Sequence, residues 1–200
     1  SEIKEQGRGI WNMIAKNLHD INPIVRHLPE TFHSVADQLG GALSAIPSVL
    51  FSSGSPSDLS HEMKSYEVGH ALIVPHPPLS RTEWILEVAQ AWPDLFSPVA
   101  YVVKGCPRPA VQLKKYIKMG VKALKLHPPA DGLGVDAIEY RKLIRVATEA
   151  GIPIILHTGC IYLRPFYKDP ELGHVELYER WFRHFRDARF VLAHMNYHYP

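Results

Sequence analysis

The sequence Ala150-Gly-Ile-Pro-Ile-Ile-Leu-His-Thr-Gly159 decides the fold of this 200-residue chain. Its apolar run, 152–156, has the length of a buried strand and is followed at once by His157. A second run of this kind, Ala188-Arg-Phe-Val-Leu-Ala-His194, also ends at a histidine. Parallel α/β folds build their sites from polar side chains at the carboxyl ends of buried strands. The two runs therefore predict such a fold, with a functional site at the strand tips.

The same pattern repeats from residue 71 onward. Strand-sized apolar runs occur at 71–75, 96–103, 121–126, 152–156 and 189–193. The amphipathic stretches between them carry helix start and stop signals and predict helices over 81–91, 109–119, 136–150 and 170–185, with Ser80 as the expected cap of the first. Strands that alternate with helices pair in parallel. Because no Gly-rich phosphate-binding turn is present, we expect a barrel of the (β/α)8 type rather than an open nucleotide-binding sheet.

Five strand and helix units cannot close an eight-stranded barrel, which takes roughly 250 residues. We therefore expect an incomplete α/β barrel over residues 51–200, with strands that correspond to about the second to the sixth. Residues 1–50 are expected to form a helical N-terminal extension for packing or dimerisation, because apolar residues recur there at near-helical spacing. Ser57 is expected to cap a short helix over 58–66.

The composition excludes several classes of partner. The net charge is only +2 and no basic run alternates with aromatic residues, which argues against nucleic-acid binding. Two cysteines are too few for a disulfide framework, and the first 25 residues show neither a secretory signal nor a membrane-spanning segment. We expect a cytoplasmic protein that acts on a small molecule and that can form a homodimer.

Strand alternation identifies the candidate site residues. If Leu124 and Leu126 face the helices, three sets of side chains point into the barrel: Lys125 with His127, Ile155 with His157, and Leu192 with His194 and Asn196. Neutral imidazole is a common ligand of divalent transition metals, so His157 and His194 are candidate metal ligands. The alternative is that each histidine is simply buried and hydrogen-bonded to a backbone carbonyl.

Several of these candidates have more than one interpretation. Lys125 could carry a balanced charge in the barrel mouth, anchor a substrate carboxylate, or bridge metals as a carbamate. His127, which precedes Pro128-Pro129, could line the mouth or cap the strand end. In the mouth, His127 and Asn196 are candidate substrate-binding residues. In the loop after His157, Tyr162 and Arg164 are candidate substrate-binding residues, and Arg164 could pair with a carboxylate, although a solvated loop is equally compatible.

Three motifs in this order resemble the amidohydrolase-related branch of metal-dependent TIM-barrel hydrolases. They are the segments 120–128 (Gly-Val-Lys-Ala-Leu-Lys-Leu-His-Pro), 150–159 and 190–194. The resemblance implies a divalent metal, usually zinc, in the barrel mouth. It makes His157 a ligand from the fifth strand and His194 a ligand or proton-transfer group from the sixth. Lys125 matches the fourth strand, where some members carry a carbamylated lysine.

The chain departs from that family pattern in two places. It shows neither a His-x-His pair before Ala71 nor an eighth-strand aspartate. The least strained explanation is that a block is missing between about Ala45 and Pro56 and another after Pro200. It predicts a pair of apparently consecutive residues in the first window whose Cα atoms lie much farther apart than the 3.8 Å of a trans peptide.

Three functions follow as expectations. The preferred one is a metal-dependent hydrolase of a small-molecule ester, lactone or amide that uses metal-activated water. The second is a nonhydrolytic decarboxylase of the same superfamily, because this branch also resembles aminocarboxymuconate-semialdehyde decarboxylase. The third is a metal-free barrel that serves as a scaffold or interaction protein.

Overall fold

The computed structural model describes residues 55–76, 80–102, 104–160 and 168–197. The helical extension expected over residues 1–50 lies outside the described residues. So does the backbone break expected in the window before Pro56. Both stay predictions.

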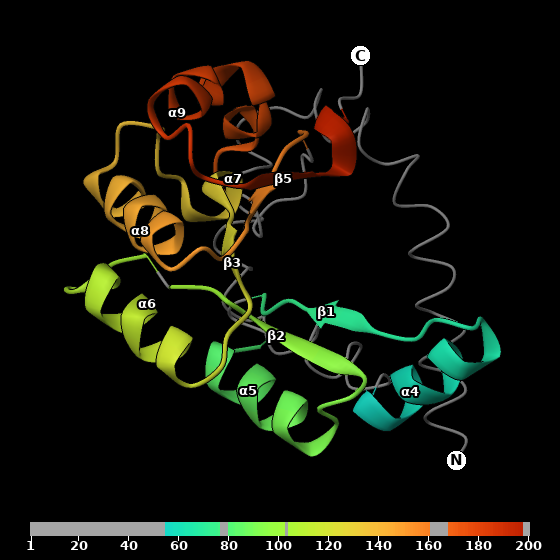
Figure 1. The fold of residues 1–200 in the computed structure, drawn as a ribbon. Coiled ribbons are helices and arrows are strands. Elements are labelled where there is room, and N and C mark those ends of the chain that lie inside the picture. Colours follow the sequence, from blue (N-terminus) through green and yellow to red (C-terminus); the bar gives the residue numbers. More distant parts are fainter. Residues whose placement is uncertain (1–54, 77–79, 103, 161–167, 198–200) are drawn as a thin grey trace, which may run out of the picture.

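The described chain contains a five-stranded parallel sheet (Figure 1). Its strands are β1 (Ala71–Ile73), β2 (Phe96–Ala100), β3 (Ala123–Leu126), β4 (Ile154–His157) and β5 (Phe190–Ala193). They pair in the order β1-β2-β3-β4-β5, and every pairing is parallel. A strand order that never reverses is the order of a barrel, whereas a doubly wound sheet reverses at a switch point. The predicted incomplete α/β barrel is confirmed.

Helices connect the strands along one side of the sheet, as Figure 1 shows for α5, α6 and α8. The α-helices are α4 (Pro56–Ser65), α5 (Thr82–Ala91), α6 (Pro109–Lys118), α7 (Pro128–Asp131), α8 (Ile138–Glu149) and α9 (Glu179–His184). Short 3-10 helices occur at η1 (Pro170–Gly173), η2 (Val175–Tyr178) and η3 (His194–Asn196).

The structure corrects two predicted caps. Ser55 rather than Ser57 caps α4, because Pro56 occupies the first helical position and the Ser55 hydroxyl accepts a hydrogen bond from the Asp58 backbone NH. Ser80 does not cap α5; its hydroxyl accepts a hydrogen bond of 2.8 Å from the His76 backbone NH instead.

The helix predicted over 170–185 is wrong as a single element. The chain forms η1, η2 and α9 there, because His174 adopts an extended backbone between the two 3-10 helices. Gly173, just before it, packs so closely against Gly159 that an added Cβ would lie 2.0 Å from the Gly159 carbonyl oxygen. The contact with the turn after β4 therefore takes precedence over helical propensity.

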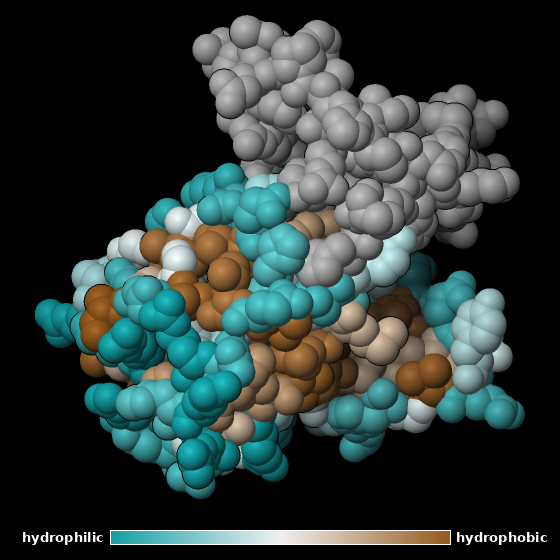
Figure 2. Space-filling model, turned by 90° about the horizontal axis from the view of Figure 1, so that it is seen from above, coloured by the Kyte–Doolittle hydropathy of each residue, from teal (hydrophilic) through white to brown (hydrophobic). Residues whose placement is uncertain are grey.

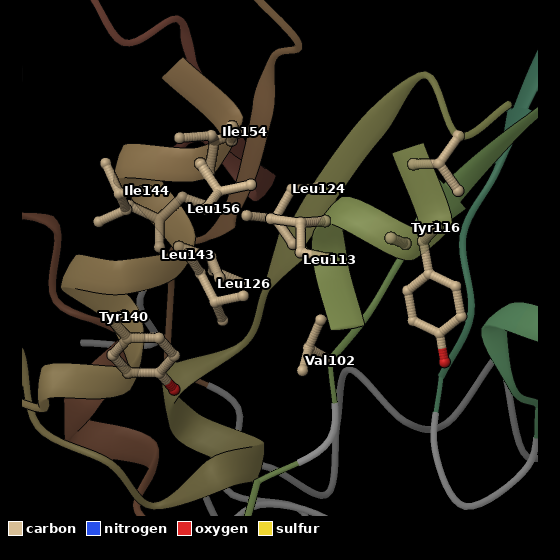
Figure 3. Close-up of a cluster of buried hydrophobic side chains, with 14 of the residues drawn as sticks. Val102, Leu113, Tyr116, Leu124, Leu126, Tyr140, Leu143, Ile144, Ile154 and Leu156 are labelled. Atoms are coloured by element: carbon tan, nitrogen blue, oxygen red, sulfur yellow. The ribbon is translucent and has the colours of Figure 1, made fainter. Parts of the chain in front are cut away.

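The main core lies between the sheet and the helices (Figure 3). Leu124 and Leu126 of β3 and Ile154 and Leu156 of β4 are buried in it. The side chains of these strands that alternate with them therefore point to the other face, the inside of the partial barrel. The predicted alternation is confirmed for β3 and β4 and places Lys125 and His157 on the inner face.

The two end strands leave apolar side chains exposed. Leu72 in β1 is 50% exposed and Val191 in β5 is 51% exposed, and in register they align with Ser97 and Ile155. Seen from above, apolar residues also gather in the middle of the molecular surface (Figure 2). Among the described helices, none combines the length and the apolar character that crossing a membrane would require.

Candidate functional site

Four histidines mark the carboxyl ends of the parallel strands. His157 is the last residue of β4, His127 directly follows β3, and His194 directly follows β5. His76 lies three residues beyond the end of β1. Since parallel strands end at the same edge of a sheet, the topology brings these side chains to one side of the partial barrel.

The imidazole rings are in contact. The rings of His127 and His157 are stacked, with centroids 3.9 Å apart and planes inclined by 21°. The ring of His194 lies 4.7 Å from that of His157 and is tilted by 57°. The ring of His76 meets that of His127 edge-on at 5.7 Å. We call these four side chains the imidazole cluster.

His194 reaches the cluster by a different route from the one predicted. The register pairs His157 with Ala193 and aligns Leu192 with Leu156, whose side chain lies in the core under the helices. Leu192 therefore does not share the inner face, and continued alternation would also turn His194 outward. The chain instead enters the left-handed region at His194, with φ of 67°, and this turn carries the ring back toward His157.

Lys125 is buried on the inner face below the cluster. Burial lowers the pKa of its amine to about 8. Burial, followed by the charge of Lys125, lowers the pKa of His157 to about 3. Desolvation and Lys125 also lower the pKa of His194. At neutral pH these imidazoles are therefore neutral, which is the form that binds a metal.

His127 combines the two predicted roles. Its Nδ1 accepts a hydrogen bond of 3.2 Å from the Ala130 backbone NH, so it caps the short helix α7 that follows the strand. Its ring still belongs to the imidazole cluster. Burial, followed by the nearby His157 and Lys125, holds the pKa of His127 well below its usual range.

The donor chemistry of the cluster fits a divalent metal, although the rings differ in how well they are oriented. Ring-nitrogen lone pairs lie in the ring plane, so the nearly parallel His127 and His157 rings cannot aim at one point. The 57° between His157 and His194 permits convergence. This makes His157 and His194 the better pair of ligands, with other donors needed to complete the shell.

Three donor atoms lie within 4.8 Å of one another at a different place in the described structure. They belong to Cys160, Glu171 and His174. Cys160 is buried just beyond the turn after β4, and the other two residues lie on and directly after η1. No local sequence pattern connects Cys160 with residues 171 and 174, because only the tertiary fold brings η1 to that turn.

Asn196 has a structural role in the described fold. Its Oδ1 accepts a hydrogen bond of 2.9 Å from the Val175 backbone NH, and its own backbone NH donates to the Thr158 hydroxyl at 3.0 Å. The residue thus connects η3 to η2 and to the end of β4. Its predicted role in substrate binding stays a prediction. Tyr162 and Arg164, the other predicted substrate contacts, lie outside the described residues.

Sequence reasoning also missed a buried acidic network beside the site. Asp131 in α7 accepts hydrogen bonds from the hydroxyls of Tyr101 and Tyr140, the latter at 2.6 Å. The Lys104 ammonium donates to the Asp131 backbone carbonyl at 2.8 Å. The partners are spread over some 40 residues of sequence, so no local pattern announces them.

The comparison with protein families now adds to this geometry. The amidohydrolase family profile matches residues 43–200. The chain belongs to the amidohydrolase family. Members of this superfamily are mostly enzymes and typically bind a divalent metal. No curated protein matches the chain closely enough to be counted as a relative.

Solved structures share the amidohydrolase barrel fold at low sequence identity. An uncharacterized TIM-barrel protein from Bordetella bronchiseptica is 22% identical, with a TM-score of 0.60 over 74% of this chain and 53% of its own. 5-Carboxyvanillate decarboxylase from Sphingomonas paucimobilis is 15% identical, with a TM-score of 0.51 over 68% of this chain and 50% of its own. 4-Oxalomesaconate hydratase from Rhodopseudomonas palustris is 16% identical, with a TM-score of 0.52 over 96% of this chain and 59% of its own. The chain thus spans between half and three fifths of these proteins.

Proposed function

We propose that this amidohydrolase-family chain belongs to a metal-dependent hydrolase of a small-molecule ester, lactone or amide. The observation that carries the proposal is the contact among the rings of His127, His157 and His194, which come from the ends of three neighbouring strands. Neutral imidazoles gathered at the carboxyl edge of a parallel barrel are the donors that a zinc ion binds.

The proposed roles follow from position and charge. His157 and His194 hold the metal, because the 57° between their ring planes permits one nitrogen of each ring to reach the same ion. A divalent ion such as zinc, when bound, lowers the pKa of water and makes it a nucleophile near neutral pH. His194, at the exposed rim, has access both to the ion and to a substrate entering from solvent.

Lys125 is proposed to hold a carboxylate of the substrate. Its amine is buried on the inner face. After burial itself, the charges that lower the pKa values of His127 and His157 come from other imidazoles and from this lysine. A substrate carboxylate that reaches Lys125 would accept a charge-assisted hydrogen bond from its ammonium group. Two relatives named for carboxylated compounds, 5-carboxyvanillate and 4-oxalomesaconate, support an acidic substrate by analogy.

The same surrounding supports a second candidate, nonhydrolytic decarboxylation of an aromatic or dienoic acid. A neutral imidazole next to a buried cation can position a carboxylate for loss of carbon dioxide as well as an ester for attack by water. The fold similarity to a decarboxylase favours this candidate. The product distinguishes the two, since only the decarboxylase releases carbon dioxide.

The test begins with the metal content of the purified chain in its natural full-length context. Carboxylated esters, lactones and amides are then assayed for hydrolysis, and aromatic and dienoic acids for carbon dioxide release. His157→Ala should lose the metal bound at the imidazole cluster, one ion per chain, and reduce either activity at least 100-fold. The matched control is His184→Ala, which removes an exposed imidazole on α9 and should change neither. Full activity of His157→Ala, or a metal-free active protein, would refute the proposal, and a metal-free inactive protein would favour the scaffold alternative.

A further inference from the structure

We propose that Cys160, Glu171 and His174 form a second zinc site, separate from the imidazole cluster. Their donor atoms, one from each side chain, all lie within 4.8 Å of one another. This spacing is what a single ion needs, because Zn–S, Zn–N and Zn–O bonds of about 2.0–2.3 Å place ligand atoms within two bond lengths of each other. We call these three side chains the thiol site.

The backbone fixes Cys160 beside η1. The Gly159 NH donates a hydrogen bond of 2.7 Å to the Gly173 carbonyl, and the Cys160 NH donates one of 3.0 Å to the Tyr197 carbonyl. Gly173 allows the two segments to approach this closely, because a Cβ added there would lie 2.0 Å from the Gly159 carbonyl oxygen. The turn after β4 is therefore held against the segment that carries Glu171 and His174, and the three donors are brought together before any ion arrives.

His174 is flanked by two carboxylates in a manner that suits a metal ligand. Its Nε2 lies 3.1 Å from Glu171 Oε2, so the two donor atoms are neighbours, and a shared zinc ion would replace the direct interaction between them. Its Nδ1 lies 3.9 Å from Glu176 Oε2 on the other side of the ring. A carboxylate at the second ring nitrogen orients a ligating imidazole and increases its basicity. The Glu176 carboxylate is at ion-pair distance and beyond hydrogen-bond distance, so we assign it a positioning role for His174 once the ion is bound.

The mixture of donors selects the ion. A thiolate and an imidazole bind zinc much better than they bind magnesium or calcium, which prefer sites made only of oxygen. Binding requires loss of the thiol proton to solvent and forms one Zn–S bond without any redox change. Cys160 is buried, while the side chains of Glu171 and His174 are 58% and 41% exposed, so the ion can enter from their side. Three protein ligands leave one coordination position for water.

The site would clamp the segment that carries His157. Cys160 follows His157 by three residues, and η1 follows the turn in sequence by some ten residues. An ion that joins Cys160 to η1 would therefore stabilise the end of β4 without entering the imidazole cluster. Its binding should raise the melting temperature of the protein.

Cobalt substitution provides the test, because Co²⁺ replaces Zn²⁺ in such sites and a thiolate bond to it gives a sulfur-to-cobalt charge-transfer band. Added Co²⁺ should produce this band in the full chain, and zinc should abolish it by displacement. Cys160→Ser should lose the band, whereas the matched control Cys106→Ser, which removes the other thiol of the chain, should keep it. A band that survives Cys160→Ser, or no band in the wild-type chain, would overturn the proposal.

Three further variants guard against misfolding and separate this site from the proposed active site. Glu171→Gln alters an exposed side chain and should weaken Co²⁺ binding at least 10-fold, and Glu176→Gln should weaken it about 10-fold through His174. His157→Ala should leave the charge-transfer band unchanged even if it abolishes catalysis. Loss of the band in His157→Ala would mean that the Cys160 thiol belongs to the imidazole cluster. Unchanged Co²⁺ affinity in Glu171→Gln would mean that Glu171 is not a ligand. Either result contradicts the proposed site.

Discussion

The ring of His194 lies 4.7 Å from the ring of His157, although the sheet register pairs His157 with Ala193. The contact depends on the turn that follows β5. His194, Met195 and Asn196 all have positive φ angles, a conformation that costs a residue other than glycine about 1–2 kcal/mol. Two hydrogen bonds compensate for the strain: the Asn196 NH donates to the Thr158 hydroxyl, and Asn196 Oδ1 accepts from the Val175 NH. The geometry of the imidazole cluster is thus determined by backbone strain as well as by the sheet.

We predict that Met195→Gly stabilises the fold. The Met195 side chain is 91% exposed, so little burial is lost, and glycine adopts its φ of 48° without steric cost. The relief of strain exceeds the conformational entropy that glycine loses on folding. The free energy of unfolding, measured by urea denaturation, should therefore rise by up to about 1 kcal/mol. Met195→Ala retains the Cβ and serves as the control. Equal stability of the two variants would show that the turn is not strained at this residue.

We predict that Gly159→Ala is severely destabilising. An added Cβ would lie 2.5 Å from the Tyr197 carbonyl oxygen, and the residue has a φ of +103°. The expected loss is about 2–3 kcal/mol or more of unfolding free energy, because both backbone segments would have to move. Gly105→Ala is the matched control: Gly105 has a φ of +83° but open space around its Cβ position, so it should lose only about 1 kcal/mol. Similar losses in the two variants would argue against the close packing of η3 on this turn.

Much of this architecture could be predicted from the sequence, because local patterns determine it. The inner positions of Lys125 and His157 follow from strict alternation in short buried strands. The helix ends at Gly120 and Gly151 follow from the left-handed residue that a helix end favours, and both glycines have positive φ. These features require no knowledge of distant partners.

The remaining features depend on contacts between distant segments. Leu192 breaks the predicted alternation because the register with β4, not the local pattern, decides which face it occupies. The helix predicted over 170–185 is interrupted where Gly173 packs against Gly159. The thiol site and the Asp131 network join residues that only the complete fold brings together.

We predict that Tyr140→Phe weakens the fold through the loss of one hydrogen bond. The Tyr140 hydroxyl donates to Asp131 Oδ2 at 2.6 Å in a buried surrounding. Removing a donor to a carboxylate should lower the free energy of unfolding by about 1.5–3 kcal/mol in chemical denaturation. Tyr66→Phe, at a side chain that is 75% exposed, should change it by less than about 0.5 kcal/mol. If both substitutions were equally mild, the carboxylate would have to be satisfied without Tyr140.

We predict that Asp131 makes stability depend on pH in the acidic range. Burial raises the pKa of this carboxyl above its ordinary value of 3.8, against the opposing effect of the hydrogen bonds from Tyr101 and Tyr140. A raised folded-state pKa means that the native state holds the proton more tightly than the unfolded state. The resulting stabilisation is present below pH about 4 and is lost as pH rises through the folded pKa.

The comparison with Asp131→Asn isolates this effect, because the amide does not titrate. Unfolding free energies of wild type and variant should be measured in urea from pH 3 to pH 7. The difference, wild type minus variant, should decrease with increasing pH. An increase with pH would mean that the tyrosine hydroxyls stabilise the carboxylate more than burial penalises it.

We predict that Lys125→Met separates stability from function. Lys125 is only 9% exposed, and placing a charged amine there costs free energy that an apolar side chain of similar length does not. Lys125→Met should therefore raise the denaturation midpoint. For the proposed carboxylated substrates, kcat/KM should decrease at least 10-fold through a higher KM. Lys122→Met, at an exposed lysine directly before β3, should alter neither quantity. A variant that is both more stable and fully active would assign Lys125 no part in binding the substrate, and a less stable one would indicate that its charge is compensated within the fold.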